Sequence, residues 1–171
     1  PCHGRRPRAY TQVVLQDCIN KTMSFGFAIA AHVILGLCGL ASSYAVALNL
    51  RKRELPLGFL KTFSLIAFLS YATSWATAAY YYVLLYGKAV KPVILAGKYP
   101  WAHTIFMESK EHIFLLIPFL SLLTAAIIWF LGNRLQSDES LRSATAALAL
   151  VTFLIGVFVT IAGVLISGAV R

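Results

Sequence analysis

The sequence is poor in charged residues, and acidic residues are the scarcest of them. Only 12% of the 171 residues are charged, with six acidic residues against 15 basic ones. Soluble domains carry about 25% charged residues, so an ordinary water-soluble domain is excluded. The net charge of +9 does not indicate nucleic acid, because the basic residues stand at the edges of apolar segments, where they contact lipid headgroups. We therefore expect a lipid bilayer, and no nucleic acid, around this chain.

Cysteines are also few, and no two of them form a CxxC pair. Cys2, Cys18 and Cys38 are odd in number, which argues against a disulfide framework. Cys2 and His3 would end a CxxCH c-type haem attachment site only if another cysteine stood three residues earlier. We favour a plain polar tail, since termini are usually untethered. Walker, dinucleotide-binding, nucleophile-elbow and HExxH motifs are also missing from the sequence.

Four long apolar segments dominate what is present. Hydrophobic residues make up 59% of the chain, and about 20 such residues in a row cross the hydrocarbon core of a bilayer. A basic, polar N-terminal segment covers residues 1–22. The apolar segments follow at about residues 23–50, 59–86, 105–131 and 144–170. The sequence predicts one all-α domain, a four-helix transmembrane bundle, in a bacterial or archaeal inner membrane or an organellar membrane.

The connection over residues 87–104 is too apolar for a free loop. Pro92 and Pro100 bracket the stretch VILAGKY, which we expect to lie on the membrane surface or to dip into the bundle. Inside the third apolar segment, Pro118 predicts a kink, because proline removes one backbone hydrogen bond. An even number of spans places both termini and this connection on the same side of the membrane.

Two histidines are candidate ligands of a haem iron. His32 lies about nine residues into the first span, and His112 lies near the start of the third, which runs in the same direction. Their depths differ by at most roughly 8 Å at 1.5 Å per helical residue. Two neutral imidazoles on facing helices can ligate a b-type haem inside an apolar bundle. The sequence therefore predicts haem b between His32 and His112.

A structural role for these histidines is the alternative. A histidine inside a membrane can instead hydrogen-bond a neighbouring hydroxyl group or a backbone carbonyl. Hydroxyl side chains that stand within the first two spans supply possible partners: Ser42, Ser64, Ser70 and Thr73.

A second polar group stands at the start of the third span. His103, Glu108, Lys110, Glu111 and His112 lie within ten residues. On one helix, Glu108 and His112 share a face, whereas His103 is about half a turn out of phase. The group can form a proton-exchanging or quinone-contacting surface, or a metal site with His103 and Glu108 as alternative ligands. We slightly favour a solvated helix start, where carboxylates face the positive end of the helix dipole.

These patterns favour a small cytochrome b-like subunit of a respiratory or redox complex, with other redox subunits as partners. Haem b is the expected cofactor, a quinone is a further candidate, and no residue is assigned a catalytic role. Two alternatives stay open. One is a cofactor-free accessory subunit of a larger membrane complex, and the other is a metal-dependent membrane enzyme or carrier.

Overall fold

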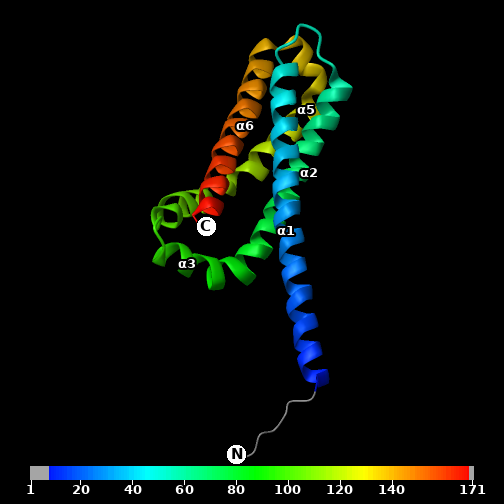
Figure 1. Ribbon diagram of the computed structural model, residues 1–171. Coiled ribbons are helices and arrows are strands. Elements are labelled where there is room, and N and C mark those ends of the chain that lie inside the picture. Colours follow the sequence, from blue (N-terminus) through cyan, green and yellow to red (C-terminus); the bar gives the residue numbers. More distant parts are fainter. Residues whose placement is uncertain (1–7, 170–171) are drawn as a thin grey trace, which may run out of the picture.

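A computed structural model describes the backbone of residues 8–169 and the side chains of residues 25–169. Within the described backbone every regular element is a helix (Figure 1). Four helical segments are long and apolar enough to cross a membrane, so the predicted all-α, four-helix transmembrane fold is confirmed. The possible haem attachment site at Cys2 and His3 lies outside the described residues.

The four spans contain eight consecutive helical elements. In chain order these are α1 (Arg8–Asn49), α2 (Leu57–Tyr81), the π-helix η1 (Tyr82–Val90), α3 (Lys91–Ala96), the π-helix η2 (Ala102–Met107), α4 (Glu108–Phe114), α5 (Leu116–Ser137) and α6 (Glu139–Gly168). The membrane-spanning parts are Phe25–Asn49, Leu57–Ala96, Ala102–Ser137 and Glu139–Gly168.

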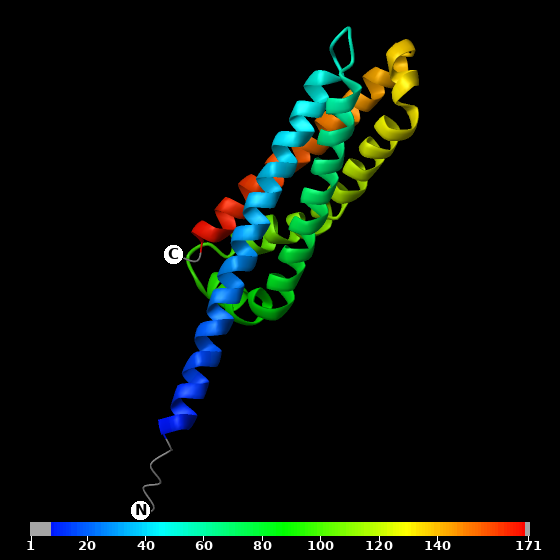
Figure 2. The same ribbon diagram turned by 90° about the vertical axis from the view of Figure 1, so that its right-hand side faces the viewer.

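The long helices form a closed bundle of four. Helix α1 packs against α2 and α6, and α5 packs against the same two helices. The α1–α2 and α5–α6 connections lie together at one end (Figures 1 and 2). Helix α3 and the C-terminal end of α6 lie at the other end. Two views thus agree that the C-terminal end and the 87–104 connection share one side.

Apolar side chains hold the bundle together along its length. Val46, Leu60 and Ile128 are buried near the end that carries the short connections, and Tyr71 and Ile117 are buried farther along. Large apolar side chains also cover the outside of the bundle. Phe130 is 85% exposed and Phe27 is 77% exposed, which is favourable in lipid and costly in water. The outer faces of these helices therefore contact the bilayer.

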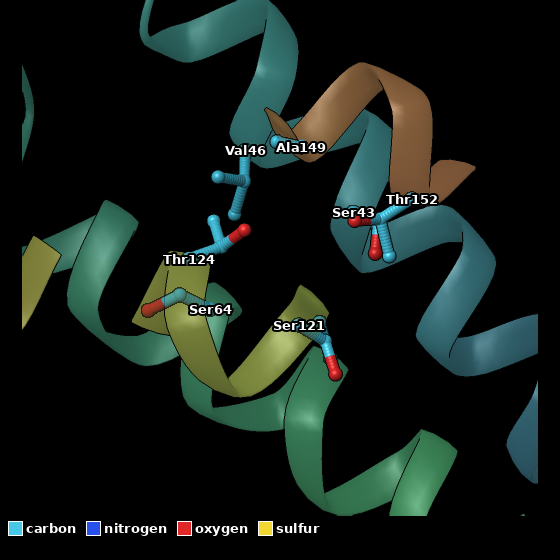
Figure 3. Close-up of a pocket in the computed structure, with 8 residues that line it drawn as sticks. Ser43, Val46, Ser64, Ser121, Thr124, Ala149 and Thr152 are labelled. Atoms are coloured by element: carbon cyan, nitrogen blue, oxygen red, sulfur yellow. The ribbon is translucent and has the colours of Figure 1, made fainter. Parts of the chain in front are cut away.

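Small and hydroxyl-bearing residues let the helices approach closely. A cavity of only about 10 Å³ remains between the four long helices, each of which contributes lining residues (Figure 3). Thr124 and Thr152 line it, and each donates a 2.9 Å hydrogen bond to a carbonyl one turn earlier on its own helix. Such a volume holds one water at most. The centre of the bundle is therefore closely packed and has no room for a cofactor.

Helix boundaries differ from the expected ones where polar residues continue a helix. Helix α1 begins at Arg8, not near residue 23, and α5 continues past Leu131 to Ser137. Leu131 has non-helical φ/ψ of −114° and 16°, so the expected end coincides with a local kink. The chain then turns at Asp138, whose Oδ1 accepts a 2.9 Å hydrogen bond from the Leu141 N–H and caps α6. Hydrophobicity marks the bilayer part of a helix and not its polar ends.

Candidate functional site

A large cavity lies at the end of the bundle that carries the 87–104 connection. Its volume is about 690 Å³, within the range of roughly 300–1,000 Å³ that is typical of ligand sites. Helices α1, α2, α4 and α6 and the π-helix η1 all contribute lining residues. In Figure 1, α6 and α1 diverge toward this end of the bundle. This cavity is the candidate functional site.

The lining is mostly apolar, and its ionisable side chains come from four elements. These are His32 of α1, Tyr71 and Tyr81 of α2, Tyr82 and Tyr86 of η1, and Lys110 and Glu111 of α4. A site of this kind binds an apolar body by exclusion of water and orients it through a few polar groups.

His32 is fixed by the backbone of α2. Its Nδ1 lies 2.9 Å from the Ser74 carbonyl oxygen and 2.9 Å from Ser74 Oγ. The Ser74 hydroxyl in turn donates to the His32 carbonyl at 2.9 Å. The ring of Phe114 packs edge-on against the imidazole, with 5.9 Å between the ring centroids. Helices α1, α2 and α4 therefore hold this imidazole in one orientation.

The Ser74 carbonyl also determines which nitrogen of His32 carries the proton. A carbonyl oxygen can only accept a hydrogen bond, so Nδ1 must be the N–H of the ring. In the neutral imidazole, Nε2 then keeps its lone pair. Histidines that bind metals through Nε2 are commonly oriented in this way, by an Nδ1–H donated to a carbonyl. Because His32 lines the cavity, Nε2 is available as an acceptor or as an iron ligand.

Glu111 places a carboxylate in the same cavity. Among the described side chains, its Oε1 is the one buried side-chain oxygen or nitrogen without a hydrogen-bond partner. Tyr82 lies beside Glu111, and Lys110 lies nearby against α6, where a Cβ added to Gly163 would be 3.5 Å from Lys110 Nζ. A buried polar atom without a partner is rare in folded proteins. Oε1 therefore indicates that a hydrogen-bond donor belongs in this cavity.

The cavity opens toward lipid. Val33, Val83 and Val164 line it and are 50%, 66% and 68% exposed. Since these valines belong to membrane-spanning segments, a molecule dissolved in the bilayer can reach the cavity between helices without crossing water.

His112, the second predicted haem ligand, lies in different surroundings. Its side chain is exposed and does not line the cavity. Its Nδ1 lies 2.7 Å from the Glu108 carbonyl oxygen on the preceding turn. By the argument used for His32, Nε2 is the nitrogen with the free lone pair. The structure therefore does not bring His112 to His32, and their pairing on a haem stays a prediction.

His103, a predicted alternative metal ligand, is buried and contacts a tyrosine hydroxyl. Both His103 and Tyr86 are only 2% exposed, and the tyrosine hydroxyl lies 3.0 Å from His103 Nδ1. Glu108 is exposed on the first turn of α4. Within the described side chains, no group of three or more His, Cys, Asp or Glu residues can hold a metal ion. His103, Glu108 and His112 are thus not gathered into one site.

The sequence places Lys110 and Glu111 only in a charged group at a helix start and does not reveal that both line a cavity. Their surroundings carried a usable signal, because Met107 and Phe114 lie three or four residues away and mark the inward face of the helix.

No family model, no curated protein and no solved structure matches this chain.

Proposed function

We propose that this protein is a membrane-embedded electron-transfer subunit that binds a lipid-soluble redox cofactor of the quinone type in the cavity beside His32. The cofactor enters from the bilayer, and partner subunits of a redox complex exchange electrons with it. The supporting observation is the cavity itself, which joins an apolar, lipid-facing interior to an imidazole and a carboxylate. A quinone likewise combines an apolar body with oxygen atoms that form hydrogen bonds.

Filling the cavity tests this proposal. Gly163 lines the cavity, and a Cβ there would make only an ordinary contact with the flexible end of Lys110. Gly163→Leu should therefore fold while occupying ligand space. We expect the quinone extracted from the purified protein to fall about tenfold, which corresponds to roughly 1.4 kcal/mol of lost binding.

Gly26→Leu is the matched control. Gly26 also belongs to a membrane helix, but an added Cβ would meet nothing within 4 Å and the residue does not line the cavity. Its quinone content should equal that of the wild type. Wild-type protein without extractable quinone, or equal contents in the wild type and Gly163→Leu, would contradict the proposal.

Haem b is a second candidate for the same cavity, favoured by the orientation of His32. The Nδ1 hydrogen bond to Ser74 leaves Nε2 as a possible axial ligand. In that case the purified protein should show a b-type reduced spectrum that His32→Ala abolishes. His112→Ala would show whether His112 is the second ligand. A colourless, folded wild type would exclude haem.

A further inference from the structure

The polar groups of the cavity indicate which form of the ligand is recognised. Glu111 Oε1 is buried and has no partner among the described residues. As a carboxylate oxygen it accepts hydrogen bonds. His32 Nε2 also keeps a lone pair, because Nδ1 carries the ring proton toward the Ser74 carbonyl. Tyr82 lies beside the Glu111 carboxyl group without satisfying Oε1, so both Oε1 and His32 Nε2 can accept a hydrogen bond from the ligand.

The two acceptors lie on adjoining parts of the cavity. Glu111 and Phe114 are three residues apart on α4, so their side chains lie on the same face, about one turn apart. The Phe114 ring contacts the imidazole of His32. One small ring can thus lie between Glu111 and His32 with a polar atom toward each.

We infer that the cavity recognises the hydroquinone form of its ligand, with one hydroxyl donating to His32 Nε2 and the other to Glu111 Oε1. This inference rests on the proposed function and adds the hydrogen-bonding state of the ligand. The oxidised quinone carries only acceptors, so its oxygens would face two lone pairs and leave Oε1 without a donor. Lys110 Nζ, on the same side of the cavity, can donate to a hydroxyl oxygen and is compatible with the hydroquinone.

Three probes of nearly equal shape separate this inference from simple apolar binding. A short-chain alkyl hydroquinone, its dimethyl ether and its quinone are titrated, without oxygen, into the detergent-purified full chain from which endogenous ligand has been removed. Calorimetry measures each affinity. We expect the hydroquinone to bind at least about tenfold more tightly than either other probe, since each of these lacks both donors.

Glu111→Gln and Glu108→Gln form a matched pair of variants. Glutamine has the size of glutamate but carries an NH₂ group, which can donate a hydrogen bond to a quinone oxygen. The preference for hydroquinone should therefore shrink in Glu111→Gln. It should be unchanged in Glu108→Gln, because Glu108 is exposed and outside the cavity. If Glu111→Gln does not fold, the ranking of the three probes on the wild type still decides.

The outcomes separate this inference from the proposed function. Equal affinities for all three probes, all weakened in Gly163→Leu, would overturn the hydroquinone preference and leave the cavity as a quinone-type site. Equal behaviour of Glu111→Gln and Glu108→Gln would overturn the role of Glu111. Failure of every probe to bind the wild type would overturn the proposed function as well.

Discussion

Polar side chains inside the bundle fall into two groups according to where their hydrogen bonds go. In the centre, Thr124 and Thr152 donate to carbonyls of their own helices. In the large cavity, Glu111 Oε1 has no partner within the described residues, and the imidazole ring of His32 uses only Nδ1 in its contacts with Ser74. The first group allows close packing at little cost, while the second leaves bonding capacity for a ligand.

Gly39 should be sensitive to the smallest enlargement. A Cβ there would lie 2.8 Å from Cδ1 of the buried Tyr71 ring. Gly39→Ala should therefore lower the free energy of unfolding by about 1–3 kcal/mol, the usual cost of overpacking. Thermal unfolding in detergent measures this effect. Gly26→Ala, where the added Cβ meets open space, should be neutral or slightly stabilising, and equal losses in both variants would refute the packing argument.

The buried pair of Tyr86 and His103 should contribute to stability through its hydrogen bond. Tyr86→Phe leaves His103 Nδ1 without its 3.0 Å partner, which should cost about 1–3 kcal/mol. Chemical unfolding in mixed micelles can measure the change. The control is Tyr80→Phe, because Tyr80 is 48% exposed, and it should unfold like the wild type. A Tyr86→Phe variant as stable as this control would show that the pair contributes nothing.

The sequence predicted that His32 has a polar partner inside the membrane, but it did not predict which residue that partner is. An intramembrane partner for His32 was expected among hydroxyl residues that included Thr73, but the structure uses Ser74. Neighbouring residues on a helix differ by about 100° in direction. The same angle separates Glu111, which lines the cavity, from His112, which is exposed. Sequence spacing sets faces within one helix but not the rotation of that helix against its neighbours.

At the scale of elements, the third span shows how one proline divides a helix. Helix α4 ends at Phe114 and α5 starts at Leu116. Pro118 has no N–H for the Phe114 carbonyl, and its ring displaces that carbonyl. The break therefore falls three to four residues before the proline, and α4 can direct Glu111 toward the cavity. The kink was predictable from the sequence because its cause is local.

Removal of that proline should straighten the span. In Pro118→Ala the new N–H can bond to the Phe114 carbonyl and join α4 to α5. Spin labels at the exposed positions Thr104 and Phe130 should then move apart, toward the about 39 Å expected of 26 straight α-helical residues at 1.5 Å each. Pro56→Ala, before the start of α2, should leave this distance unchanged. An unaltered distance in Pro118→Ala would contradict the role of Pro118.

Composition alone predicted that the 87–104 connection is ordered, but it did not predict the conformation of the connection. Its apolar residues and prolines indicated an ordered segment. In the structure Ile94 is fully buried with Tyr86, Ala102 and Ile166. The two π-helices that flank α3 were not foreseen, because such turns depend on tertiary contacts as well as on local sequence.

For the whole molecule, hydrophobic segment length was sufficient to predict the fold. Four apolar segments on a short chain leave few arrangements besides a bundle. The cavity was not predictable, since it depends on how far α1 and α6 diverge at one end. At that end the 87–104 connection packs against α6 through residues far apart in the sequence, such as Ile94 and Ile166.

The arrangement of the ends gives a direct test of topology. Single cysteines at Lys98 and Ser167 should react with an impermeant reagent from one side of the membrane. Cysteines at Lys52 and Asp138 should react only from the other side. All four residues are exposed, so accessibility should not limit labelling. Reaction of Lys98 and Ser167 from opposite sides would exclude an even number of crossings between them.

The lipid-facing valines at the edge of the cavity also decide how its occupancy responds to concentration. A ligand that enters from the bilayer is at equilibrium with its mole fraction in lipid, and not with its concentration in the surrounding buffer. Dilution of a proteoliposome suspension with buffer should leave occupancy nearly unchanged for a strongly partitioning ligand. Fusion with ligand-free vesicles should lower it. For the proposed quinone-type ligand, the ligand content of the membrane should therefore set the occupancy of the cavity.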